Sequence, residues 1–270
     1  MKSNNFVKLL LTLVASMISF IPFYITINVA FKPMTDMSSR WLLPKELYLG
    51  NFVTAIEKAN IFGAMKNSLI ITLFSVLIIV FVGAMAAYPL ARIRNKFNRS
   101  VLNLILAIMM VPPLSILVPL YSNLSKMGGI STYWGIIIII ATFQLPLSIF
   151  IYTNFIISIP RTIDEAAMID GCTDFQIYYK IILPLLKPVT ATVIILTGVA
   201  AWNDYQFSLF FLQDPKMRTV TLAISSFFSQ SSSNLNAAAA AALMAIVPVV
   251  IIYIMLQKYF VKGMIDSAIK

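Results

Sequence analysis

The sequence offers few side chains that could carry out acid–base or metal chemistry. It contains no histidine and a single cysteine, Cys172. These two facts exclude histidine general bases, zinc sites built on histidine and an internal disulfide bond. No G-x-x-x-x-G-K-[ST] stretch is present, so the chain lacks the usual phosphate-binding loop of nucleotide hydrolases. We therefore predict no catalytic residue, no metal site and no cofactor bound by this chain.

The most informative group of polar residues lies in segment 158–188. Thr162-x-x-Glu165 has the spacing of a capping box, in which the hydroxyl caps an early amide and the carboxylate bonds back to the threonine N–H. Gly171 is suited to end the helix, because glycine adopts the left-handed conformation readily. The pattern predicts a short helix that begins at Thr162 and stops at Gly171.

A second short helix is expected directly after Gly171. Thr173-x-x-Gln176 offers another capping box at its start. The helix should continue to about Leu183, where Pro184 interrupts it. The segment as a whole is too apolar for a simple solvated connection, so its two helices are expected to contact something.

Two contacts are compatible with this helix–glycine–helix segment. Its apolar, small-residue side could enter a groove on a partner protein through Ile163, Ala166, Ala167 and Ile169. It could equally lie among lipid headgroups as an amphipathic element, anchored by Phe175, Tyr178 and Tyr179. The residue pattern alone does not separate the two.

The elements that position this segment are membrane helices. The chain is 60% hydrophobic and only 11% charged, whereas soluble domains are about 25% charged. Apolar runs long enough to cross a bilayer predict an all-α integral membrane protein of one domain, residues 1–270. The six predicted spans are 9–31, 67–90, 101–122, 133–157, 189–211 and 239–261. The last begins in the alanine run 237–242, whose small side chains predict close helix packing.

The distribution of basic residues predicts the orientation of the spans. The short segment 92–99 carries four lysines and arginines, and such loops stay in the cytoplasm. Both termini and segment 158–188 then lie on the cytoplasmic side. The net charge of +10 follows from this topology, so we predict no nucleic-acid partner.

One carboxylate falls inside a predicted span. Asp204 would cost about 2.5 to 3.5 kcal/mol at mid-bilayer, so it must face a cavity, a partner or the outer interface. Trp202 and Tyr205 beside it are typical of the interface. Alternatively, Asn203 and Asp204 line a translocation path or brace its outer gate. Gln144 is a weaker candidate of the same kind.

Segment 158–188 also carries a family pattern. It resembles the EAA loop of binding-protein-dependent ABC importers in Glu165-Ala166-Ala167, Asp170-Gly171 and Ile181-x-Leu183-Pro184. Around it, the chain resembles the smaller permease subunit of maltose-type carbohydrate importers from end to end. Further matching stretches are Asn67-Ser68-Leu69, Ala87-Tyr88-Pro89-Leu90-Ala91-Arg92, Val111-Pro112, Pro119-Leu120-Tyr121, Ile159-Pro160, Trp202-Asn203-Asp204 and Phe260-Val261-Lys262-Gly263.

This resemblance implies a fold and a set of partners. The fold would be the six-helix type I importer permease, multi-pass in a bacterial-type cell membrane. The EAA loop would be a coupling helix that docks into a cleft on a cytoplasmic ATPase. The docking residues it implies are Glu165, Ala166, Ala167, Asp170, Gly171, Ile181, Leu183 and Pro184. The implied partners are a second permease, two ATPase subunits that hold ATP and magnesium, an extracytoplasmic solute-binding protein, a sugar and membrane lipid.

Two departures from the family and three rival functions accompany this interpretation. Cys172 stands where the family has alanine, and Ser267-Ala268 stands where it usually has a glycine-alanine pair.

One rival is import of another small solute, such as glycerol phosphate or a polyamine. A non-ABC channel or scaffold is the second. An intramembrane enzyme is the third, and the missing histidine and paired acids weigh against it.

Overall fold

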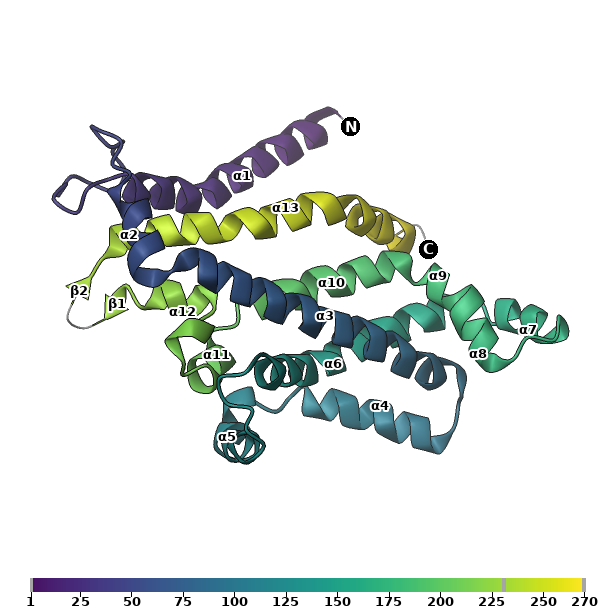
Figure 1. Cartoon of the computed structure of the whole chain (residues 1–270). Coiled ribbons are helices and arrows are strands. Elements are labelled where there is room, and N and C mark those ends of the chain that lie inside the picture. The colour runs from purple at the N-terminus through teal and green to yellow at the C-terminus, as the bar shows by residue number, and fades with distance from the viewer. Residues whose placement is uncertain (1, 230–231, 269–270) are drawn as a thin grey trace. The chain divides into compact units, whose positions relative to one another are not determined.

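The computed structural model describes residues 2–229 and 232–268, and it confirms the all-α architecture (Figure 1). Among the described residues, extended pairing is limited to β1 (Phe228–Ser229) and β2 (Ser232–Ser233), which run antiparallel. The chain divides into two compact units. One unit comprises residues up to Met65 together with Val220–Pro248, and the other comprises Lys66–Thr219 together with the chain from Val249 onward.

Four helices of the described chain are long and apolar enough to cross a membrane. They are α1 (Lys2–Ala30), α3 (Ile61–Arg92), α6 (Tyr133–Ser158) and α13 (Leu235–Ala268). Two bent helix pairs bring the number to six if each pair is one span. The first pair joins α4 (Lys96–Ile108) to η1 (Pro113–Ile116) and α5 (Leu117–Lys126), with a bend of 95°. The second joins Asp174–Leu185 to α10 (Lys187–Trp202), with a bend of 71°.

Two spans differ from their predicted form. The predicted span 101–122 is not continuous, because Pro112 and Pro113 lack backbone donors and disfavour helix just before them. The predicted span 189–211 stops as a helix at Trp202 and resumes as the separate short helix α11 (Gln206–Phe211) after a turn. Both differences arise where turn-forming residues lie within apolar runs that hydropathy joins together.

The first unit contains α1, α2 (Gly50–Ala59), α12 (Val220–Ser225) and the beginning of α13. Helix α2 lies in a stretch that hydropathy marks only as a connection outside the membrane. A small core packs Val29 and Ala30 of α1 against Ala239 and Ala240 of α13. The alanine run therefore permits close helix packing, as its small side chains predict.

A buried lysine organises the turn that follows α1. The ammonium group of Lys32 donates to the Ser38 hydroxyl at 2.7 Å and to the Ser39 carbonyl at 2.8 Å. The side-chain amides of Asn51 and Asn236 each donate to the Lys32 carbonyl at 2.7 Å. Segments far apart in the sequence are thus joined at one residue.

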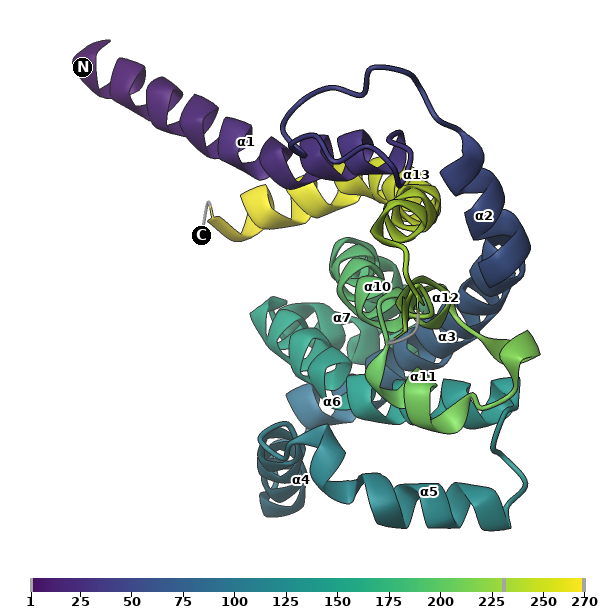
Figure 2. The same ribbon diagram turned by 90° about the vertical axis from the view of Figure 1, so that its left-hand side faces the viewer.

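Helix α6 is central to the second unit. It contacts α4, α10 and α11, and Figures 1 and 2 show α3 and α10 running beside it. The buried Ser148 hydroxyl of α6 donates to the Ile79 carbonyl of α3 at 3.2 Å. The Tyr152 hydroxyl, also on α6, donates to the Thr190 hydroxyl of α10 at 3.0 Å. These bonds and the surrounding core tie three long helices together, and Figure 1 shows α7 and α8 beyond one end of them.

Candidate functional site

Segment 158–188 begins with α7 (Thr162–Ile169). The helix begins at Thr162, as predicted, but Arg161 occupies the N-cap position and makes no side-chain cap bond. The prediction of a Thr162–Glu165 capping box is therefore wrong. The chain turns into helix directly after Pro160, whose carbonyl accepts from the Ile163 N–H at 3.3 Å. Thr162 then lies inside the helix, where its hydroxyl no longer has the position of a cap.

The end of α7 matches the prediction for Gly171. Its φ angle is +80°, in the left-handed region that favours glycine. The Gly171 N–H donates to the Met168 carbonyl and the Cys172 N–H donates to the Ala167 carbonyl, both at 3.0 Å. This pair of bonds is the Schellman arrangement that closes a helix C-terminus. The segment therefore reverses direction sharply at Gly171.

The second predicted capping box is present. The Thr173 N–H donates to the Gln176 side-chain oxygen at 2.8 Å, and the Gln176 N–H donates to the Thr173 hydroxyl at 3.4 Å. Helix α8 (Asp174–Ile177) continues through a π-helical turn, η2 (Tyr178–Ile182), into α9 (Leu183–Leu185). The helical run ends at Leu185, two residues beyond the predicted end. Pro184 does not interrupt it, because proline is tolerated in the first turn of a helix, and α9 ends at its C-cap residue Leu186.

Helix α7 has an inner and an outer face. Asp164 and Ala167 are buried, and Ala167 joins the core of the second unit. The remaining family-pattern residues of this helix and its end are exposed, namely Glu165, Ala166, Asp170 and Gly171. Ile169 and Phe175 are exposed at 87% and 72%. The outer face therefore presents small, acidic and apolar groups together, while Ala167 is covered by its own chain.

The later family-pattern residues mostly support the fold. Ile181 and Leu183 are half-buried and pack against the core of the second unit. Pro184 is exposed. Glu165, Ala166 and Gly171 are thus exposed, whereas Ile181 and Leu183 pack against the core.

A buried ion pair that the sequence reasoning missed joins α7 to α3. Arg92 Nη2 lies 2.7 Å from Asp164 Oδ2, and the two side chains are 9% and 7% exposed. Arg92 Nε also donates to Asp164 Oδ1 at 3.3 Å, and the Tyr88 hydroxyl donates to the same oxygen at 3.3 Å. Arg92 Nη1 donates to the Ile159 carbonyl, and Arg161 Nη2 donates to the Arg92 carbonyl, both at 3.0 Å. The end of α3 therefore donates hydrogen bonds to the region of α7, and Arg161, just before α7, donates one back to α3.

Beside this ion pair lies a cleft of about 610 Å³ between the end of α3 and the α7–α8 region. Met85 and Pro89 of α3 form part of one wall, and Glu165, Met168 and Phe175 form part of the other. Its lining is largely apolar with charged groups at intervals, which is the chemistry of a protein contact surface rather than of a catalytic centre.

The candidate path residues lie around the end of α10. The Asp204 carboxylate accepts from the Ser208 N–H and hydroxyl, both at 2.8 Å, and from the Phe207 N–H at 3.3 Å. It therefore caps the start of α11, where an acid is favourable. Asn203 is exposed, and its side-chain amide donates to the Val199 carbonyl at 3.0 Å. Gln144 is half-buried on α6.

Asn67 is a further junction, and the sequence reasoning gave it no structural role. Its side-chain amide donates to the carbonyls of Lys216 and Arg218, both at 2.9 Å. Its side-chain oxygen accepts from the Tyr133 hydroxyl at 2.7 Å. One buried side chain thus joins α3 to the start of α6 and to the turn around η3 (Pro215–Met217).

We expect Asn67→Ala to lower the free energy of unfolding by about 1 to 3 kcal/mol, because one buried side chain loses three hydrogen bonds at once. The measurement is thermal or denaturant unfolding of the purified protein in detergent. Asn103→Ala, at an exposed position on α4, is the matched control and should change stability little. Equal stability of the two variants would contradict the assignment.

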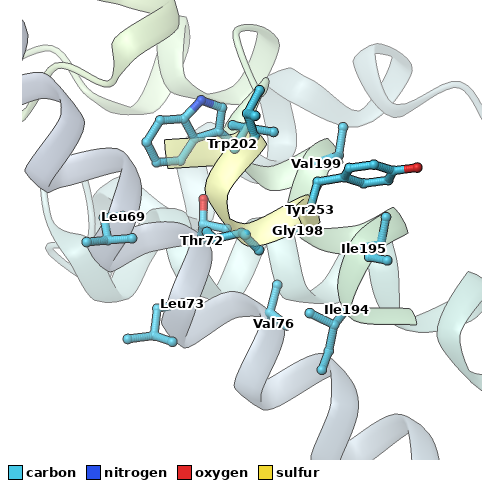
Figure 3. Close-up of a pocket in the computed structure, with 13 residues that line it drawn as sticks. Leu69, Thr72, Leu73, Val76, Ile194, Ile195, Gly198, Val199, Trp202 and Tyr253 are labelled. Atoms are coloured by element: carbon cyan, nitrogen blue, oxygen red, sulfur yellow. The ribbon is translucent and has the colours of Figure 1, made fainter. Parts of the chain in front are cut away.

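An apolar cavity of about 350 Å³ lies within the second unit. Figure 3 shows Leu69, Thr72, Leu73 and Val76 of α3 across from Ile194, Gly198 and Trp202 of α10. A sugar needs several hydrogen-bonding groups in its site, whereas this lining is almost entirely hydrocarbon. We therefore assign no sugar site to this cavity.

Potential metal ligands do not gather anywhere in the described chain. Within residues 2–229 and 232–268, no group of three or more histidine, cysteine, aspartate or glutamate side chains could hold a metal ion.

Comparison with protein families gives a match over most of the chain. Residues 79–266 match the family described as "Binding-protein-dependent transport system inner membrane component". This range contains segment 158–188 and all the candidate site residues predicted from the sequence.

Two curated proteins are similar along the whole chain. The melibiose/raffinose/stachyose import permease protein MelC of Bacillus subtilis (strain 168) is 44% identical over 270 residues, which cover 100% of this chain and 98% of MelC. The probable starch degradation products transport system permease protein AmyC of Thermoanaerobacterium thermosulfurigenes is 36% identical over 274 residues, covering all of both chains.

A solved structure shares the fold. A chain of a bacterial ABC transporter involved in the import of the acidic polysaccharide alginate aligns with a TM-score of 0.79 at 22% sequence identity. The alignment covers 96% of the present chain and 97% of that one. At this level of identity the comparison supports the architecture.

Proposed function

The chain belongs to the family of binding-protein-dependent transport system inner membrane components, and from this premise we propose that it is a membrane-spanning permease subunit of an ATP-driven carbohydrate importer. The full-length similarity to MelC, whose name gives melibiose, raffinose and stachyose as its cargo, is the observation that carries the proposal. Such a subunit forms half of the translocation path and performs no chemistry. ATP and magnesium are held by partner ATPase subunits.

The outer face of α7 is the surface proposed to meet an ATPase. Glu165, Ala166, Asp170 and Gly171 are exposed there. Small side chains at 166 and 171 let a partner approach the backbone, and Glu165 supplies a charge for pairing with a basic group. Ala167, Ile181 and Leu183 act beneath this face by packing, and exposed Pro184 lies at the end of the helical run.

The remaining partners follow from the same proposal. A second homologous permease completes the path, two ATPase subunits bind the cytoplasmic face, and an extracytoplasmic solute-binding protein delivers the sugar. The basic segment 92–99 supports a cytoplasmic position for the α7 end of the second unit and for both termini. The protein is thus proposed to be a multi-pass component of the cell membrane.

Asn203, Asp204 and Gln144 are proposed to act at the path rather than at the ATPase. The carboxylate of Asp204 holds the start of α11 through three hydrogen bonds. This supports a role in bracing the outer end of α10, with exposed Asn203 beside it. Gln144 is the third candidate, because it is a polar residue within the apolar helix α6.

The proposal is tested by purifying the tagged chain from its native membrane in mild detergent and reconstituting the recovered complex in vesicles. We expect an ATPase and a second permease to co-purify. Uptake of labelled raffinose should require both ATP and the solute-binding protein. Uptake of glycerol phosphate or a polyamine instead of any sugar would overturn the carbohydrate assignment. Flux without ATP, from a complex lacking an ATPase, would overturn the importer assignment in favour of a channel.

A further inference from the structure

The buried ion pair between Arg92 and Asp164 has no part in ATPase contact as proposed above. Its two residues lie 72 positions apart in the sequence, one in the last turn of α3 and the other in the first turn of α7. A base at a helix C-terminus and an acid at a helix N-terminus are both favoured by the helix dipoles. The pair thus joins two helix ends that each stabilise the charge placed there.

The geometry of the pair resists both sliding and rotation. The guanidinium contacts both carboxylate oxygens, through Nη2 at 2.7 Å and Nε at 3.3 Å. Contact with both oxygens of one carboxylate limits rotation of the two side chains as well as their separation. The Tyr88 hydroxyl holds Asp164 from a second direction, at 3.3 Å. Two further bonds, from Arg92 to the Ile159 carbonyl and from Arg161 to the Arg92 carbonyl, prevent the helix ends from pivoting about the ion pair.

Adjacent acids of α7 differ in exposure, although both line the cleft beside α3. Asp164 is 5% exposed and faces its own chain, whereas Glu165 is exposed on the outer face. Consecutive helix residues are separated by about 100° around the axis. Asp164 can therefore be held by α3 while the exposed Glu165 stays open to a partner.

We propose that Arg92 and Asp164 are positioning residues that make α7 and the adjoining end of α3 move as one body. This inference rests on the proposed function, in which an ATPase contacts α7, and it adds that movement of the ATPase displaces this helix. Covalently, α7 is joined to α6 only through the short non-helical stretch around Pro160. The ion pair adds a second, rigid connection to α3, a long helix that also lines the apolar cavity. Displacement of α7 is thereby delivered to α3 and is not lost by bending at Pro160.

The experiment measures sugar molecules imported per ATP hydrolysed by the reconstituted transporter, together with the amount of co-purified ATPase. Asp164→Asn keeps the shape of the side chain and removes its charge. We expect it to retain the ATPase and to hydrolyse ATP, while the import ratio falls about tenfold or more. Arg92→Lys keeps the positive charge but lacks the planar guanidinium that contacts both carboxylate oxygens, so the import ratio should fall less than in Asp164→Asn. The exchange Arg92→Asp with Asp164→Arg should recover part of the ratio.

Two charge-removing variants serve as matched controls. Arg94→Gln and Lys180→Gln change exposed residues near the end of α3 and in segment 158–188 and should leave the ratio unchanged. If Asp164→Asn imports as much sugar per ATP as the wild type, this inference is overturned while the proposed function stands. If that variant loses the ATPase, the inference is also overturned, because the pair would then serve docking. If Asp164→Asn does not fold, Arg92→Lys is judged by the same two measurements. Absence of ATP-driven uptake by the wild type would overturn the proposed function and this inference with it.

Discussion

Gly171→Asp is expected to abolish transport while the protein still inserts in the membrane and folds. A Cβ atom at this position would meet no other atom of the chain within 4 Å. Space inside the subunit is therefore not what requires glycine. Strain from the φ angle of +80° remains, and for most L-residues it costs about 1 to 2 kcal/mol. Asparagine and aspartate tolerate this conformation better than other residues, so their effect reports mainly on what approaches Gly171 from outside.

The measurement compares uptake and ATPase co-purification for Gly171→Asp, Gly171→Asn and Gly171→Ala. If contact with the ATPase requires a bare backbone, all three lose the ATPase, and aspartate loses most. If strain alone matters, asparagine retains transport and alanine is the poorest. Gly128 is a matched control, with φ of +69° and equally open space. Gly128→Asp should leave uptake unchanged. Normal uptake by Gly171→Asp would refute the assigned contact.

Gly135→Ala is expected to lower the free energy of unfolding by about 1 to 3 kcal/mol, as overpacking does in other interiors. Gly135 lies in the first turn of α6, where its N–H donates to the capping hydroxyl of Thr132 at 3.2 Å. An added Cβ would overlap the carbonyl oxygen of Gly129, which itself accepts from the Thr132 hydroxyl at 2.8 Å. Because the obstacle is backbone, it cannot rotate away, and the whole cap must shift.

Gly198→Ala is the matched substitution, since it makes the same chemical change in another apolar helix. Its Cβ would make an ordinary contact with Val76, at 3.7 Å, inside the apolar cavity shown in Figure 3. Alanine is favoured over glycine in a helix by about 1 kcal/mol, so stability should stay the same or rise. Unfolding of both variants in detergent is the measurement. A loss at 198 as large as that at 135 would show that helix propensity and local space do not govern these sites.

Local signals in the sequence predict the structure well where a few neighbouring residues decide the conformation. Gly171 ends α7 and Thr173 with Gln176 begins α8, because each feature depends on backbone bonds within five residues. The same logic failed at Thr162. The helix begins there, but Arg161 takes the N-cap position, so the capping-box spacing of Thr162 and Glu165 does not correspond to a capping box.

Contacts between distant segments were not visible in the sequence. Nothing near Asp164 marks it as the partner of Arg92, and the family pattern directs attention to the adjacent Glu165. Asp204 illustrates a different limit. Hydropathy averaged over a window places it inside a span, whereas the structure ends the helix at Trp202 and uses the carboxylate as a cap. An acid two residues before Gln206, the first residue of a short helix, was the available signal.

Because Asp164 is buried and Glu165 is exposed, α7 requires a fixed number of residues before it as well as particular residue types. Insertion or deletion of one residue between Pro160 and Asp164 would rotate the rest of α7 by about 100° relative to its anchor. The acid that pairs with Arg92 and the acid that faces outward would then both be misdirected, although every side chain is still present. Substitution scans keep this spacing fixed and would not detect it. Natural relatives should therefore keep the same number of residues between the proline and the acid pair, whatever other differences their α7 carries.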